Sequence, residues 1–151
     1  MVAFEPVDPD YERRTRESFA KQGIMGHIGA FLSVVQPGHV EIALPFRPEL
    51  SQQHGFFHAG VISTIADSAG GYAGFTLFPA DAGVLTVEFK INLLAPADGE
   101  RAFAVGDVVR SGRTLTVCRL EAFVEKQGKR THCATGMQTL MSLVGRAGVK
   151  G

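Results

Sequence analysis

The fold is decided by the stretch His58-Ala59-Gly60-Val61-Ile62-Ser63-Thr64-Ile65-Ala66-Asp67-Ser68-Ala69, which continues to about Leu77. Its apolar residues recur every three or four positions, the spacing of a helix with one buried side. A solvated helix face normally carries Lys, Glu or Arg, but the opposite stripe of this helix holds only small residues and one acid. The members of that stripe are Ser63, Thr64, Asp67, Ser68 and Gly71. The sequence therefore predicts a long central helix that is buried on both sides.

Patterns typical of β-strands lie before and after this helix. Two apolar runs at 28–35 and 40–44 flank the turn signal Gln36-Pro37-Gly38-His39, which predicts a hairpin. Short turns containing glycine separate the later runs and favour antiparallel pairing of neighbouring strands. Those runs are Val84 to Leu93, Ala102 to Arg110, Leu115 to Glu125 and Arg130 to about Leu143. The order predicts an α+β fold in which a single antiparallel sheet of about six strands covers the helix.

Length and composition narrow the classes of protein. A chain of 151 residues is expected to form one domain, which begins with a polar surface helix over about 9–22. Because 15 Lys plus Arg balance 15 Asp plus Glu, no net field favours nucleic acid or an anionic membrane. No apolar run approaches the roughly 20 residues that span a bilayer, and the acidic N-terminus does not match an export signal. Cys118 and Cys133 lack metal-ligand spacing, so a cytoplasmic protein without metal is expected.

Asp67 is the leading candidate for chemistry. Between Leu50 and Ala80 it is the only formally charged side chain apart from histidines. An ionised carboxylate in apolar surroundings is costly unless it is hydrogen-bonded, so Asp67 is either satisfied by groups such as Ser63 or used in a reaction. The start of the helix near Ala59 offers free amides that could polarise a substrate carbonyl, although most such amides are merely capped or hydrated.

Other motifs exclude several enzyme classes. His54 and His58 stand four residues apart at a loop-to-helix junction, with no third ligand nearby, so a metal site is not predicted. The chain has no G-x-S-x-G elbow of a serine hydrolase, and the glycines at 23, 26 and 29 do not match a dinucleotide fingerprint. Phenylalanines near the helix could line an acyl or aryl pocket or belong to the core.

The helix stretch, together with the run from Val84 to Ala97, resembles the hotdog-fold acyl-CoA thioesterases of the phenylacetate-degradation type, the PaaI-like family. The shared pattern is His-small-Gly, an acid nine residues after the histidine, a polar strand position and a Pro-Ala stop. The resemblance covers most of the chain, from about Gly23 to Leu143. The resemblance implies a sheet wrapped around the helix, two subunits that share a continuous sheet, and commonly a dimer of dimers with active sites at the subunit interface.

The resemblance also implies roles for four residues. Asp67 would be the catalytic carboxylate, either as general base on water or as nucleophile. Ala59 would offer its backbone N–H to the thioester carbonyl, and Gln52 would orient water or the carbonyl group. Thr86 of the neighbouring subunit would assist the attacking water. The family's usual His-Gly-Gly reads His-Ala-Gly in this chain, so a β-carbon stands where the thioester approaches the backbone.

The implied substrate is an acyl-CoA or aryl-CoA thioester. His58 and Gly60 would flank its carbonyl, and Arg110, Arg113 and Lys90 are candidates for binding the CoA phosphates. Because CoA arrives as part of the substrate, no cofactor and no metal are expected.

Two other activities remain open at this stage. A hotdog enoyl-CoA hydratase or dehydratase would pair a histidine with an acid, and His58 and Asp67 could form that pair, although nine residues of helix span roughly 13 Å. A non-catalytic acyl-CoA binding protein would hold the same ligand without turnover. The chain has no basic helix or DNA-binding appendage that would transmit such binding.

Overall fold

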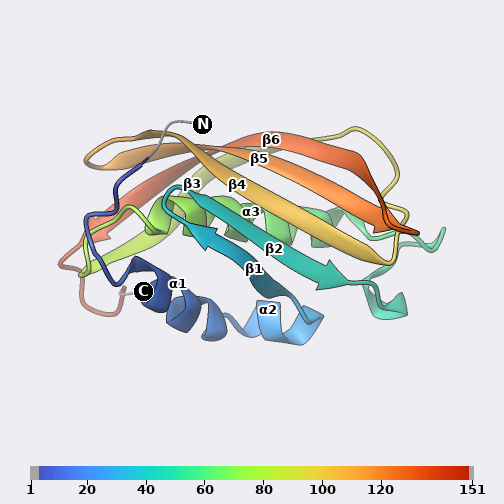
Figure 1. Ribbon diagram of the computed structural model, residues 1–151, viewed down its shortest axis with the longest axis horizontal. Helices are drawn as coiled ribbons and strands as arrows, with labels where there is room; N and C mark the ends of the chain where they lie inside the picture. The colour runs from blue at the N-terminus through green and yellow to red at the C-terminus, as the bar shows by residue number, and fades with distance from the viewer. Residues whose placement is uncertain (1–3, 150–151) are drawn as a thin grey trace.

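A computed structural model describes residues 4–149 of the chain. Its elements, in chain order, are α1 (Tyr11–Ala20), α2 (Gly23–Ile28), β1 (Phe31–Gln36), β2 (His39–Pro45), the 3-10 turn η1 (Pro48–Leu50), α3 (Ala59–Phe75), β3 (Ala82–Leu93), β4 (Arg101–Ser111), β5 (Leu115–Lys126) and β6 (Lys129–Val144). The six strands form one sheet in the order β1-β2-β4-β5-β6-β3, and every neighbouring pair is antiparallel. The sheet curves over α3 (Figure 1), which confirms the predicted α+β arrangement.

The core lies between α3 and the concave face of the sheet. Apolar residues at helical spacing on α3 are buried, as the sequence pattern requires, and they meet inward-facing residues of four strands. The buried set includes Ile62, Ile65, Ala66, Ala69 and Ala73 of α3 and Ile42, Leu44, Ala104, Leu120 and Leu140 of the sheet. Gly106 of β4 permits close packing, because a β-carbon there would overlap the α3 backbone at Ala69 and Gly70.

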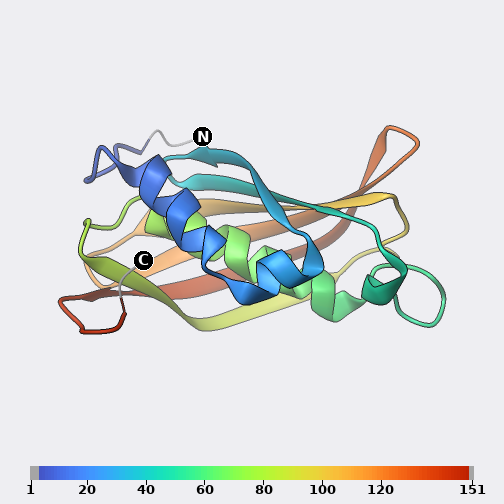
Figure 2. The same cartoon turned by 90° about the horizontal axis from the view of Figure 1, so that it is seen from below.

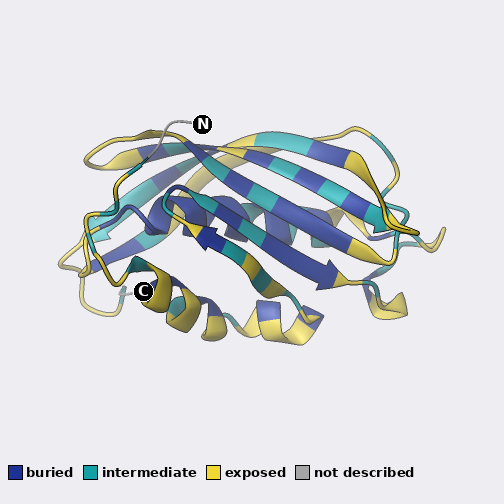
Figure 3. Ribbon diagram, in the orientation of Figure 1, coloured by how far each residue is buried: buried dark blue, intermediate teal, exposed yellow. Residues whose placement is uncertain are grey.

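The small-residue stripe of α3 is only partly covered. Ser68 and Gly71 are buried, but Ser63 and Thr64 are half-buried (Figure 3). The prediction of burial on both sides is therefore wrong for the first half of α3. Both hydroxyl groups are hydrogen-bonded in these positions. Ser63 Oγ and Thr64 Oγ1 donate to carbonyl oxygens of α3 one turn earlier, each at 2.8 Å.

Helix α1 packs against the side of α3 that the sheet leaves open (Figure 2). It is not wholly superficial, because Arg14, Thr15 and Phe19 are buried. The Arg14 guanidinium pairs with Asp8 at 3.0 Å and donates to three carbonyls at and just beyond the end of α3. A single buried cation thus joins α1 to α3.

The segment after α1 differs from the sequence prediction. Gly23 was expected to end the first helix, and a strand was expected from Ile28, but residues Gly23–Ile28 form the second helix α2. Met25 and Ile28 anchor this helix in the core. Gly29 ends it in the left-handed conformation (φ 82°), which glycine adopts without steric cost, so β1 begins only at Phe31.

Strand β3 forms one edge of the sheet and carries several exposed apolar side chains. Leu85, Val87, Phe89 and Leu93 are 42–57% exposed. A long apolar edge is a template for pairing with another strand. Within residues 4–149, no helix is long and apolar enough to cross a membrane.

Candidate active site

Only one oxygen of the Asp67 carboxylate, Oδ1, accepts hydrogen bonds from described residues. Thr86 Oγ1 donates to Asp67 Oδ1 at 2.7 Å, and Gln138 Nε2 donates to the same oxygen at 2.6 Å. Across the described part of the chain, Oδ2 accepts no hydrogen bond and the carboxylate has no salt-bridge partner. Asp67 therefore has one oxygen in fixed hydrogen bonds and one oxygen left for a ligand.

Asp67 borders a hollow of about 300 Å³ between α3, β3 and Gln22, which lies in the link between α1 and α2. The lining is mixed in polarity and consists of Gln22, Asp67, Ser68, Gly71, Tyr72, Val84, Leu85 and Thr86. Burial raises the pKa of the Tyr72 phenol, whose oxygen lies 3.2 Å from Ser18 Oγ. Tyr72 thus stays protonated at neutral pH and offers hydrogen bonding rather than charge.

The first turn of α3 leaves one amide unpaired. His58 caps the helix with its ring, because its Nδ1 accepts the Gly60 N–H at 2.8 Å. The next two amides, of Val61 and Ile62, donate to the His58 carbonyl. Ala59 N–H has no acceptor among residues 4–149. It is therefore available to a ligand at the positive end of the helix dipole.

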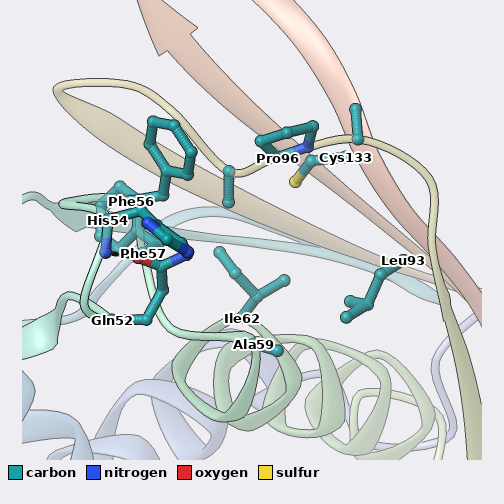
Figure 4. Close-up of a pocket in the computed structure, with 11 residues that line it drawn as sticks. Gln52, His54, Phe56, Phe57, Ala59, Ile62, Leu93, Pro96 and Cys133 are labelled. Carbon is teal, nitrogen blue, oxygen red and sulfur yellow. Dashed lines mark hydrogen bonds between the residues drawn. The ribbon is translucent and has the colours of Figure 1, made fainter.

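Ala59 borders a second hollow, of about 320 Å³, which Figure 4 shows between the loop before α3, the start of α3 and the end of β3. Its lining is mostly apolar and consists of Gln52, His54, Phe56, Phe57, Ala59, Ile62, Leu93, Ala95, Pro96, Ala97 and Cys133. The structure thus brings Gln52 to the same hollow as Ala59. Burial raises the pKa of Cys133 to about 11, so its thiol is not a nucleophile at neutral pH.

One chain does not bring all four predicted catalytic residues together. Asp67 and Ala59 border different hollows, and the eight residues of helix between them span about 12 Å. Thr86 was expected to act from the neighbouring subunit, but it bonds Asp67 of its own chain. The reason is that β3 directly follows α3 and runs back beside it.

The three basic residues suggested for CoA phosphates lie away from both hollows. Lys90 on β3 bonds Asn92 Oδ1 at 2.6 Å, Arg110 lies near the end of β4, and Arg113 lies in the turn after it. None of the three lines either hollow.

Two other lysines border a third hollow, of about 460 Å³, beside the β5–β6 turn. Lys126 is paired with Asp98 at 2.7 Å, whereas Lys129 has no salt bridge to any described residue. This hollow adjoins the one at Ala59, because both include Phe56, Ala95 and Pro96. Among residues 4–149, no group of three or more His, Cys, Asp or Glu side chains could hold a metal ion.

The sequence analysis did not single out Gln138, although it contacts Asp67 directly. A signal was present, because Gln138 is a polar residue two positions before Leu140 and shares its inward face in an alternating strand. That face is buried in the structure, with Gln138 only 1% exposed.

Comparison with known proteins identifies relatives of this chain. The family model described as "Thioesterase superfamily" matches residues 54–131. The crystal structure of a thioesterase family protein from Silicibacter pomeroyi matches with a TM-score of 0.88 at 48% identity, over 89% of this chain and 99% of that one. A thioesterase from Haemophilus influenzae shares the fold, with a TM-score of 0.75 at 21% identity over 84% of this chain and 87% of that one. A Saccharolobus solfataricus protein named "Putative esterase" is 32% identical over 124 residues, 82% of this chain and 79% of that one. By its sequence match and its helix wrapped in a six-stranded sheet, the chain belongs to the thioesterase superfamily and has the hotdog fold.

Proposed function

We propose that the protein hydrolyses an acyl-CoA or aryl-CoA thioester to the free acid and CoA, as a PaaI-like member of its superfamily. The observation that carries this proposal is the state of Asp67. Its Oδ1 is bound by Thr86 and Gln138, while Oδ2 has no donor among the described residues. A carboxylate arranged in this way can act as a base on water or as a nucleophile.

The active site requires two copies of the chain. Ala59 and Asp67 lie four residues on either side of Ser63 on α3. A two-fold axis at Ser63 exchanges these positions, and so places Asp67 of one copy opposite Ala59 of the partner subunit. Gly60, Ser63 and Thr64 are small residues on this face of α3, which would let two α3 helices approach closely.

The sheet edge supports the same homodimer. Antiparallel pairing of β3 with its symmetry copy would cover exposed Leu85, Val87, Phe89 and Leu93 and join two sheets into one. Val109 and Met137 expose further apolar surface on the sheet, which a second dimer would cover in a dimer of dimers.

In this dimer, Ala59 N–H of the partner subunit donates to the thioester oxygen and stabilises the charge that develops there. Asp67 either takes a proton from water, whose oxygen attacks the carbonyl carbon, or attacks that carbon itself and is then released by water. The carbon–sulfur bond breaks, and the CoA thiolate leaves and is protonated. Gln52 orients the water or the carbonyl, and His58 and Gly60 shape the turn that presents the amide.

The geometry favours hydrolysis over the two alternative activities. A hydratase would need the His58 ring free to act beside Asp67, but Nδ1 of that ring caps α3 by accepting the Gly60 N–H. A pure binding protein would not need a carboxylate with one oxygen kept open. Cys118 and Cys133 are buried free thiols, which suits the proposed cytoplasmic setting.

The CoA phosphates have two candidate binding sites. Arg110, Arg113 and Lys90 are the residues suggested by the family resemblance. Lys126 and Lys129 are favoured by their position, because the hollow that they line adjoins the one at Ala59.

The test is thiol release from a panel of acyl-CoA and aryl-CoA esters. Wild-type protein should release thiol, and Asp67→Ala should lower kcat by at least about 100-fold. Asp10→Ala, which removes an exposed acid on the protein surface, serves as the matched control. Equal rates for wild type and Asp67→Ala would remove Asp67 from the mechanism. Hydration of an enoyl-CoA without thiol release would favour the hydratase, and intact ligand after long incubation would favour a binding protein.

A further inference from the structure

Gln138 is a polar side chain inside the core, and its amide nitrogen is aimed at Asp67. Gln138 Nε2 lies 2.6 Å from Asp67 Oδ1, 3.0 Å from the Asp67 carbonyl oxygen and 3.1 Å from Thr86 Oγ1. The residue is 1% exposed. Burying an amide is unfavourable unless hydrogen bonds replace its contacts with water, and all the bonds made by this amide go to Asp67 or to its partner Thr86.

The orientation of the amide is set by Asp67. A flipped amide would point its oxygen at the Asp67 carboxylate and carbonyl, which are both acceptors. Only the NH₂ group can face them, so Gln138 Oε1 points the other way. That oxygen is buried without a hydrogen-bond partner among residues 4–149. The fold thus leaves an acceptor unsatisfied in order to keep two donors on Asp67 and Thr86.

The helix also makes room for this side chain. Gly70 lies one turn after Asp67 on α3, and a β-carbon at Gly70 would overlap both Gln138 Oε1 and Leu120 Cδ2. Glycine inside a helix costs about 1 kcal/mol relative to alanine. Gly70 is therefore unfavourable for the helix alone, but it leaves the space that the Gln138 side chain occupies.

We propose that Gln138 is a positioning residue that assigns different tasks to the two oxygens of Asp67. Gln138 and Thr86 together engage Oδ1, so the reacting atom is Oδ2, whether Asp67 acts as base or as nucleophile. This inference rests on the proposed thioesterase activity and adds the atom at which it occurs. Gln138 touches no substrate, because it lies in the core behind the carboxylate.

Without Gln138, the Asp67 side chain can rotate and exchange its two oxygens. Displacement of a reacting group by about 1 Å can reduce the rate about 100-fold. Substrate binding should not change, because Gln138 lines neither the hollow at Asp67 nor the one at Ala59. The inference therefore predicts a loss in kcat with KM preserved.

The test compares two variants of similar size. Gln138→Leu removes both donors and the unsatisfied Oε1, so it should lower kcat about 100-fold without lowering stability. Gln138→Glu places a second carboxylate against Asp67, so its kcat at neutral pH should fall at least as far. Thr139→Val is the matched control, because its side chain points to the opposite face of the same strand. Its kcat should equal that of wild type.

A double variant separates positioning from general structural support. If Gln138 acts only through Asp67, Asp67→Ala combined with Gln138→Leu should be as active as Asp67→Ala alone. Losses that multiply would overturn the positioning role, as would a kcat loss that only tracks the unfolded fraction in a thermal melt. Full activity of Gln138→Leu beside an inactive Asp67→Ala would overturn this inference alone. Full activity of Asp67→Ala would instead refute the proposed function, on which the inference about Gln138 rests.

Discussion

Ala59→Pro tests the backbone amide that the proposed mechanism uses. A main-chain N–H cannot be removed by an ordinary side-chain substitution, but proline lacks it. Ala59 is the first residue of α3, the helix position where proline is favoured. His58 has φ −63° and ψ 139°, an extended conformation that is compatible with a following proline.

The expected magnitudes follow from the hydrogen bonds of that turn. Ala59 N–H has no acceptor among the described residues, so its removal breaks no helix bond, and the free energy of unfolding should change by less than about 0.5 kcal/mol. Loss of one donor to a developing oxyanion costs about 2.7 to 4 kcal/mol of barrier, which corresponds to about 100- to 1,000-fold in kcat. KM should change much less, because the bond strengthens as charge develops.

The assay is thiol release by wild type, Ala59→Pro and Ala59→Gly, with a thermal melt of each. Ala59→Gly keeps the amide and should retain at least wild-type kcat. A fully active Ala59→Pro variant that melts like wild type would refute the role of this amide. Equal losses in Ala59→Pro and Ala59→Gly would show that the side chain matters rather than the N–H.

Three further predictions concern binding and stability. Lys129→Gln should raise KM about 10-fold for an acyl-CoA but not for the corresponding acyl-pantetheine thioester, which lacks the phosphates. If Arg113→Gln raises KM in this way and Lys129→Gln does not, the phosphates bind at the β4–β5 turn instead. Arg14→Met should lower the free energy of unfolding by about 3 to 5 kcal/mol, because it leaves the half-buried Asp8 carboxylate without its cation and three carbonyls near the end of α3 without their donor. Urea unfolding with an unchanged m-value measures that loss, and a change below about 1 kcal/mol would contradict it. Gly70→Ala should cost about 1 to 3 kcal/mol through overpacking and should also lower kcat by displacing Gln138. A Gly70→Ala variant that matches wild type in both measurements would show that the side chain has room.

The long elements were predictable from sequence because their hydrophobic periods are strong. Helix α3 has a full apolar stripe at helical spacing, and β3 alternates polar and apolar residues from Thr86 to Leu93, so each pattern fits one type of element. Helix α2 was missed because six residues with glycines at 23 and 26 are too short to show a period. Its ends are set by packing of Met25 and Ile28 and by the conformation of Gly29.

The candidate site was predictable only where local sequence determines it. Asp67 stands out in an otherwise uncharged segment, and the Ala59 amide follows from the helix start. Gln138 depends on a partner 71 residues away in sequence, and only the β3–β6 register and the packing of α3 bring the two together. The hollow at Lys129 likewise joins two strands with the loop at Phe56. Such contacts form only in the folded chain, and no characteristic spacing of residues in the sequence indicates them.

The central claim is that each active site takes Asp67 from one subunit and the Ala59 amide from the other. It is tested most directly by mixing Asp67→Ala and Ala59→Pro subunits, which should each be inactive alone. Random exchange makes half of the dimers mixed, and each mixed dimer holds one intact site, so activity should recover to about a quarter of wild type. No recovery in a sample where differently tagged subunits co-purify would contradict the shared site.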